Sequence, residues 1–267
     1  MQNKTFIVAE AGINANSNLL TAFNMIDLAC IAKVNAIKFQ LWRSNRFPEL
    51  EQYRFLFKQM AEIKEYAGLN NIKWFCTPFD FESIDFLAEL GMDIWKVPSG
   101  MVTNRKYLEK IKSINPNQVF LSTGMADLDE IRTVLHILGW WQMEGPSNII
   151  ILHCTTAYPC MIEEVNLKAI YELIEYHGQE NVGLSDHTLG IEIPIAAVAL
   201  GASVIEKHFT LDRNMPGPDQ KMSLEPEELK AMVKAIRNVE LAMGDGIKRP
   251  TPSELKVRDE IRERMKL

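Results

Sequence analysis

Cysteine is scarce in this chain of 267 residues, and its few cysteines are scattered. They form no C-x-x-C pair, and no second pair completes a zinc site, so we expect buried or incidental free thiols in a reducing compartment. The opening residues "MQNKTFIVAEAG" carry only a short apolar run and do not resemble a signal peptide. No stretch approaches the roughly 20 apolar residues of a membrane span. The sequence therefore predicts a cytoplasmic protein that does not enter a membrane.

An excess of basic residues is also absent. Lys and Arg number 29 against 35 Asp and Glu, which gives a formal net charge of −6. Such a balance disfavours non-specific nucleic-acid binding, which requires a basic face. An anionic small substrate is still compatible with it, because a local basic pocket is enough. No G-x-G-x-x-G follows the first predicted strand, which argues against a dinucleotide-binding fold.

Short β-rich runs alternate with longer segments whose apolar residues recur at helical spacing. The predicted strands cover residues 5–12, 36–42, 73–79, 94–100, 118–124, 148–156, 182–188 and 203–210. The helical segments that stand out cover residues 20–34, 55–69, 82–91, 128–141, 167–178, 193–202 and 226–244. Glycines typical of helix ends stand at Gly68, Gly91, Gly178, Gly201 and Gly244.

Eight strand–helix units predict an α/β protein with the fold of a (β/α)₈ TIM barrel, as a single domain. Strands that are apolar on both faces agree with a buried parallel sheet. We expect the barrel to occupy residues 1–246. A linker marked by Pro250 and Pro252 and a short, charged, helical C-terminal tail would follow over residues 247–267.

Polar side chains stand at the end of every predicted strand, where barrels of this type place their functional sites. Lys38 and Lys96 lie on different strands and could point at one anion. Two ammonium groups with converging hydroxyls describe a phosphate or carboxylate pocket. The hydroxyl residues that we assign to this pocket are Thr77, Ser99, Ser122 and Ser185.

Two histidines occupy matching positions at the ends of the last two strands. His187 and His208 could share one divalent ion, because neighbouring parallel strands lie roughly 4.8 Å apart. Glu10 or Asp219 would add a carboxylate, and histidine with carboxylate and water suits a transition-type divalent ion over Ca²⁺. His153 is expected to face the same way as these two histidines, with no clear partner. The helical histidines, His136 and His177, are expected at the surface.

Eight short motifs in one order give the sequence a family resemblance. It resembles the N-acetylneuraminate (sialic acid) synthase family over about residues 6–254, and the shared motifs are "IKFQ", "CTPF", "WKVPSG", "LSTGM", "HCTTAYP", "GLSDHTLG", "EKHFTLDRNMPGPD" and "SLEPEEL". The resemblance implies condensation of phosphoenolpyruvate with an open-chain N-acetylated hexosamine aldehyde, such as N-acetylmannosamine. The products would be a sialic acid, or an analogue such as legionaminic acid, and inorganic phosphate.

The resemblance also implies roles for individual residues. His187 and His208 would hold a divalent metal, Mn²⁺ in the first place and Mg²⁺ or Co²⁺ as alternatives. Phosphoenolpyruvate would contact Lys38, Thr77, Lys96, Ser99, Ser122 and Ser185. The sugar would lie near Gln40, Tyr158 and Asp219. Glu10 matches the family's acid on the first strand, and the residues expected in catalysis are Glu10, Lys38, His187 and His208.

Three departures from the family pattern fall on the sugar side. Met101 replaces an acidic residue that normally follows "SG", and Ala15 replaces a histidine. Losing a general acid or base typically costs about 10²–10⁴-fold in rate. We also expect the barrel alone, without the family's small C-terminal antifreeze-like domain, which completes the site of a swapped dimer.

These departures leave three hypotheses. The first is a sialic-acid-type synthase, with a separate antifreeze-like-domain protein as one expected partner and a homodimer as the expected assembly. The second is a related phosphoenolpyruvate-dependent aldol-type enzyme that acts on another aldehyde. The third is a non-catalytic paralogue or partner subunit that binds phosphoenolpyruvate or a sugar.

Overall fold

Eight parallel strands close into a barrel in the computed structural model, which describes residues 4–140 and 148–266. Each strand pairs with its neighbours in chain order, and β1 pairs with β8 to close the ring. The strands are β1 (Phe6–Gly12), β2 (Ala36–Leu41), β3 (Lys73–Pro78), β4 (Ile94–Val97), β5 (Gln118–Ser122), β6 (Ile149–Cys154), β7 (Val182–Asp186) and β8 (Val204–His208). The predicted (β/α)₈ barrel is therefore confirmed.

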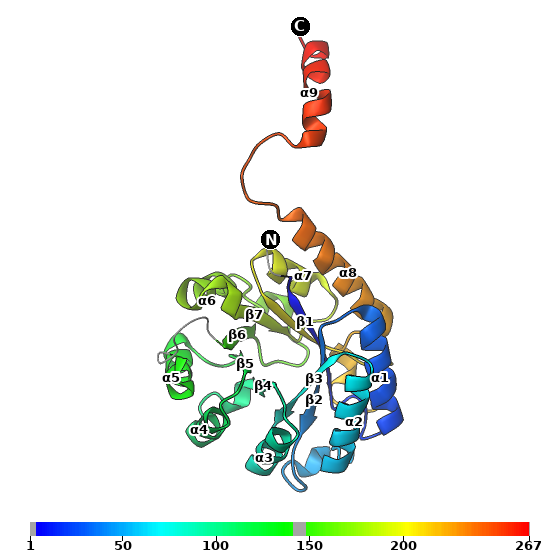
Figure 1. Cartoon of the computed structure of the whole chain (residues 1–267), viewed down its shortest axis with the longest axis vertical. Coiled ribbons are helices and arrows are strands. Elements are labelled where there is room, and N and C mark those ends of the chain that lie inside the picture. Colours follow the sequence, from blue (N-terminus) through cyan, green and yellow to red (C-terminus); the bar gives the residue numbers. More distant parts are fainter. Residues whose placement is uncertain (1–3, 141–147, 267) are drawn as a thin grey trace.

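A helix follows each strand, and the helices surround the barrel (Figure 1). They are α1 (Leu19–Ala32), α2 (Phe57–Leu69), α3 (Phe81–Glu89), α4 (Arg105–Ser113), α5 (Leu128–Leu138), α6 (Ala169–His177), α7 (Glu192–Ala199) and α8 (Pro226–Ala242). The loops contain short 3₁₀ turns at Pro48–Tyr53, Ser99–Met101, Ile162–Glu164, Gln179–Asn181 and Gln220–Met222.

Apart from small shifts in helix boundaries, three differences from the predicted segments stand out. Helix α4 was not among those that stood out in the sequence. Gly68 does not end a helix, because α2 continues to Leu69. Helix α5 ends at Leu138, where Gly139 adopts φ 88°, and residue 141 of the predicted segment lies outside the described residues. The other four predicted helix-end glycines follow their helices with positive φ.

The tail forms helix α9 (Pro252–Arg264), which begins at a Thr251 cap and extends away from the barrel in Figure 1. Its side chains are almost all exposed, and its ion pairs join residues of the tail itself, such as Arg264 and Glu260. The division of the chain after residue 246 stays a prediction. Among the described residues, no helix is long and apolar enough to cross a membrane.

The interior of the barrel is apolar at one end and charged at the other. Phe6, Phe75 and Phe120 meet edge to face near the strand beginnings. Side chains along a strand alternate between its two faces, so the same inward faces carry Glu10 and Lys38 near the strand ends. Register places Glu10 opposite both Lys38 on β2 and His208 on β8. The fold thus brings Glu10, Lys38 and His208 to one level near the carboxyl ends of their strands.

The close approach of β7 and β8 depends on a glycine. A Cβ built on Gly183 would lie 2.5 Å from the Val204 carbonyl oxygen and 2.8 Å from a Leu152 methyl carbon. Gly183→Ala must therefore push the strands apart, and overpacking of this kind costs about 1–3 kcal/mol of unfolding free energy. We expect a lower urea midpoint for this variant.

Gly68→Ala is the matched control, because a Cβ there meets nothing within 4 Å and the residue lies in helix α2. Alanine should raise stability there by about 0.5–1 kcal/mol, since glycine weakens helix interiors. An unchanged urea midpoint for Gly183→Ala would contradict the tight strand contact.

Candidate functional site

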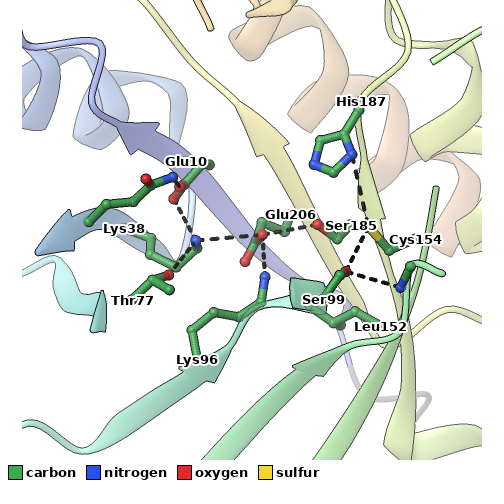
Figure 2. A network of polar contacts seen from close by, with 12 residues as sticks. Glu10, Lys38, Thr77, Lys96, Ser99, Leu152, Cys154, Ser185, His187 and Glu206 are labelled. Atoms are coloured by element: carbon green, nitrogen blue, oxygen red, sulfur yellow. Dashed lines mark hydrogen bonds and ion pairs between the residues drawn. The ribbon is translucent and has the colours of Figure 1, made fainter. Parts of the chain in front are cut away.

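A buried carboxylate joins the two predicted lysines across the barrel. Glu206 Oε1 lies 2.6 Å from Lys96 Nζ and 3.6 Å from Lys38 Nζ, and it accepts a hydrogen bond from Ser185 Oγ at 3.0 Å. Figure 2 shows Glu206 between the two ammonium groups, with Ser185 on its far side. Each of these side chains is almost fully buried. The two lysines thus converge, as the sequence predicts, and they converge on a residue to which it assigned no role.

A second carboxylate extends this cluster toward β1. Glu10 Oε2 lies 2.8 Å from Lys38 Nζ, which also donates to Thr77 Oγ1 at 3.0 Å. The amide of Gln40 donates to Glu10 Oε1 at 3.1 Å. Lys38 therefore links the two carboxylates, since it contacts both of them and one hydroxyl.

The pKa values of the two carboxyl groups are shifted in opposite directions. Burial raises the pKa of Glu10 to about 7, and Lys38 only partly offsets that effect. Burial also opposes ionisation of Glu206, but the charges of Lys38 and Lys96 outweigh it and lower its pKa to about 2. Near neutral pH the cluster thus holds one firmly ionised carboxylate and one that readily gains or loses a proton.

The two histidines meet at the same end of the barrel. Their ring centroids are 5.5 Å apart. His187 Nδ1 lies 2.8 Å from the Thr155 carbonyl oxygen, which can only accept, so this nitrogen carries the proton and Nε2 is left as a ligand atom. His208 Nδ1 is buried without a hydrogen-bond partner among the described residues, 3.9 Å from Asp219 Oδ2. Burial, followed by the effect of His187, holds the pKa of His208 well below its ordinary value, which keeps the ring neutral.

Other predicted residues surround the histidines and lysines. The ring of Tyr158 lies 4.2 Å from the His187 ring, centroid to centroid, while 53% of the residue stays exposed. Ser99 Oγ accepts from the Gly124 amide at 3.0 Å and lies 3.7 Å from Cys154 Sγ. A Cβ on Gly124 would lie 2.0 Å from Thr156 Oγ1 and 2.9 Å from Ser99 Oγ, so a larger residue here would have to displace these two side chains.

Several buried polar atoms at this end lack a hydrogen-bond partner within the parts of the chain that the structure describes. They include Ser122 Oγ, Thr156 Oγ1, Glu206 Oε2 and His208 Nδ1. Buried polar groups are normally satisfied, so a cluster of unsatisfied ones indicates a place for a ligand. A separate cavity of 660 Å³ opens at the opposite end, lined by Phe6, Lys73 and Asp93 among others, and none of the predicted site residues reaches it.

Two expectations about histidines are wrong. His177 is buried, not at the surface, because it ends α6 against the barrel, where its Nε2 contacts the Ile149 carbonyl oxygen at 3.0 Å. His153 does not face the lysines and carboxylates, because its Nε2 contacts the Val165 carbonyl oxygen in the following loop at 2.7 Å. The prediction for His136 is confirmed, because this residue is exposed.

Glu206 is the one member of this buried cluster to which the sequence analysis assigned no role. Its signal is its position two residues before His208, which places both on the same face of β8. The expected carboxylate ligand does not join the two histidines. In residues 4–140 and 148–266, no three His, Cys, Asp or Glu side chains lie close enough to one another to hold an ion. Glu10 pairs with Lys38 instead.

Fold and site together define a (β/α)₈ barrel that gathers two lysines, two carboxylates and two histidines at the carboxyl ends of its strands. Residues 44–248 match the model of the NeuB family. The N,N'-diacetyllegionaminic acid synthase of Campylobacter jejuni is 45% identical, over 95% of this chain and 81% of that protein. The N-acetylneuraminate-9-phosphate synthase of Homo sapiens is 34% identical, over 95% of this chain and 75% of that protein.

A solved structure agrees with these sequence matches. The N-acetylneuraminic acid synthetase of Leptospira borgpetersenii, in complex with citrate, superimposes with a TM-score of 0.87 at 37% identity and covers 99% of this chain and 93% of that one. The chain therefore belongs to the NeuB family, whose members are phosphoenolpyruvate-condensing synthases of nonulosonic acids. The family resemblance of the sequence is confirmed.

The raised pKa of Glu10 predicts how the unfolding free energy of the protein depends on pH. Because that pKa rises from 4.5 to about 7 on folding, the protonated side chain favours the folded state below pH 4.5, and this contribution is lost as pH rises through 7. Glu10→Gln stays neutral. The unfolding free energy of the wild type, relative to this variant, should fall between pH 5 and 8 by an amount on the order of 3 kcal/mol.

Urea unfolding at constant ionic strength measures this difference. Glu109→Gln on the exposed side of α4 controls for loss of an acidic side chain, and its profile should run parallel to the wild type. Parallel profiles for wild type and Glu10→Gln would show that Glu10 ionises as easily in the folded protein as in the unfolded chain.

Proposed function

We propose that this protein condenses phosphoenolpyruvate with an N-acetylated hexosamine aldehyde, N-acetylmannosamine or an analogue, to give a sialic-acid-like nonulosonic acid and phosphate. The observation that carries this proposal is the convergence of Lys38 and Lys96 beside the pair His187 and His208. The lysines would then hold an anionic substrate next to two histidines that could hold a divalent metal. That arrangement suits carbon–carbon bond formation.

The lysine side of the site suits phosphoenolpyruvate, which carries a carboxylate and a phosphate. Lys38 and Lys96 supply two cations in a buried setting, where charge-assisted hydrogen bonds are strong. Ser122 offers a hydroxyl with no other partner among the described residues. The Thr77 and Ser185 hydroxyls bond Lys38 and Glu206, and Ser99 accepts from the Gly124 amide. Glu206 holds both ammonium groups in place before the substrate binds.

The histidine side suits a divalent metal. His187 presents Nε2, since its Nδ1 proton is held by Thr155, and His208 has a buried ring nitrogen without a partner in the described part of the chain. These two residues would hold the ion. We propose Mn²⁺, with Mg²⁺ or Co²⁺ as alternatives, and the ion would act as a Lewis acid on the aldehyde oxygen. Substrate oxygens and water would complete its coordination, because the protein offers two imidazoles.

The remaining side chains would orient the sugar and move protons. Gln40 and Asp219 would hydrogen-bond sugar hydroxyls, and Tyr158 would cover the sugar from the loop after β6. C3 of phosphoenolpyruvate would attack the aldehyde carbon, and water would add at C2 before phosphate leaves. Glu10, with a pKa of about 7, can give or take a proton on the sugar side during these steps. Lys38 and Lys96 would stabilise the departing phosphate.

Met101, at the position where the family pattern has an acidic residue, supports two alternative functions. It is buried in the turn after β4, where its sulfur lies 3.7 Å from the Asn104 amide, so no carboxyl group reaches the site from this position. A different aldehyde substrate, or a non-catalytic role in binding phosphoenolpyruvate or a sugar, would tolerate this change. A homodimer, a separate antifreeze-like-domain partner and a cytoplasmic location stay predictions.

The direct test is phosphate release from phosphoenolpyruvate with Mn²⁺ and a panel of N-acetylated hexosamines, including the diacetylated sugar that the legionaminic acid synthase of Campylobacter jejuni suggests. We expect sugar-dependent release that a chelator abolishes. His187→Ala should lower the rate at least 100-fold, because it removes half of the protein's metal ligands, and His136→Ala on the exposed face of α5 should not. No release with any sugar would exclude a stand-alone synthase.

Met101→Glu tests whether the missing acid limits the rate. A positioned general acid or base supplies about 10²–10⁴-fold, so we expect this variant to raise kcat at least tenfold, while the KM for phosphoenolpyruvate stays the same. Met101→Gln has a similar size and no titratable proton, and it should show no gain. An equal or lower kcat for Met101→Glu would show that another group already performs this proton transfer.

A further inference from the structure

Behind the two histidines, on the outward faces of their strands, lies a second buried ion pair. Lys207 precedes His208, and Asp186 precedes His187. Lys207 Nζ lies 2.5 Å from Asp186 Oδ2, and neither side chain is more than 2% exposed. Asp186 stands at a strand end, but it points away from the barrel interior and cannot join the substrate pocket.

Thr188 closes this ion pair into a network. Its amide donates to Asp186 Oδ1 at 3.1 Å and its hydroxyl donates to Asp186 Oδ2 at 3.0 Å. Its carbonyl oxygen accepts from Lys207 Nζ. The three residues therefore bind one another on both sides of His187 and immediately before His208. We call Asp186, Thr188 and Lys207 the strand clamp.

The strand clamp lies where the sheet itself stops. The pairing of β7 with β8 ends at Asp186 opposite Lys207, so His187 lies one residue beyond the last pair. Backbone pairing with β8 no longer sets its distance from His208. The side-chain network continues the connection between the two chain segments past that point.

A buried ion pair is an inefficient way to stabilise a fold, because desolvation of the two charges offsets most of their attraction. At this place the ion pair instead fixes the relative position of the two strand ends. We propose that the strand clamp sets the spacing of the two imidazoles and thereby the affinity of the site for its metal ion. Asp186, Thr188 and Lys207 are positioning residues that touch neither substrate nor metal, and this role rests on the proposed metal site.

The test removes both charges together, because a single substitution would leave a buried unpaired ion. In Asp186→Asn/Lys207→Met the side chains keep nearly the same size. We expect this double variant to bind Mn²⁺ about 10–100-fold more weakly, as measured by electron paramagnetic resonance of free Mn²⁺ during titration. At saturating Mn²⁺ its KM for phosphoenolpyruvate should stay within threefold of the wild type, since Lys38 and Lys96 are unchanged.

The control is Arg237→Met/Glu240→Gln, which removes a partly buried ion pair at the opposite end of the barrel, next to Thr5. Its Mn²⁺ affinity should equal that of the wild type. Unchanged Mn²⁺ affinity in the Asp186/Lys207 variant, or an equal loss in the control, would overturn the strand clamp.

Two further results keep the test decisive. A wild-type protein that binds no Mn²⁺ would overturn the metal site itself and the strand clamp with it, whereas loss of binding in His187→Ala supports the site. Should the double variant fail to fold, Thr188→Val decides, because it removes one hydrogen bond and keeps both charges. At least threefold weaker Mn²⁺ binding would support the strand clamp, and unchanged binding would overturn it.

Discussion

Two lysines and two glutamates share a buried space at the carboxyl ends of the strands, and the site depends on their mutual neutralisation. A single charge buried there would lose its proton or gain one, because desolvation strongly opposes ionisation. Glu206 keeps both lysines in place and stays ionised itself. Glu10 is the weaker acid, with a pKa near 7, and this difference supports the proposal that Glu206 acts electrostatically while Glu10 transfers a proton.

The barrel positions these charges so that they pair with one another. Strand register and the alternation of side chains place them on inward faces, above a layer of phenylalanine rings. The same alternation sends Asp186 and Lys207 outward, behind the histidines. One face of β7 and β8 thus carries the two histidines that we propose as metal ligands, while the other carries the Asp186–Lys207 ion pair that links the two strands. Chemistry and positioning are separated by a single residue step along each strand.

Much of this could be predicted from the sequence. Alternating strand and helix patterns indicated the barrel, and polar residues at strand ends indicated which end carries the site. Partner choice could not be predicted, because it depends on side chains that meet across the barrel. Lys96, for example, pairs with Glu206, which lies 110 residues further along the chain. His177 looked like a surface residue, since a helix pattern does not show which of its polar residues meets a backbone carbonyl. The outward turn of His153 was missed for the same reason.

Calorimetric titration of phosphoenolpyruvate tests most directly whether the paired lysines form the anion site. Wild type, Lys96→Met and Lys73→Met should be compared with Mn²⁺ present and sugar absent, since Lys73 is an exposed lysine at the opposite end of the barrel. Lys96→Met should bind at least 100-fold more weakly, and Lys73→Met should bind like the wild type. Equal affinity of Lys96→Met and wild type would contradict the assignment of the lysine cluster to phosphoenolpyruvate.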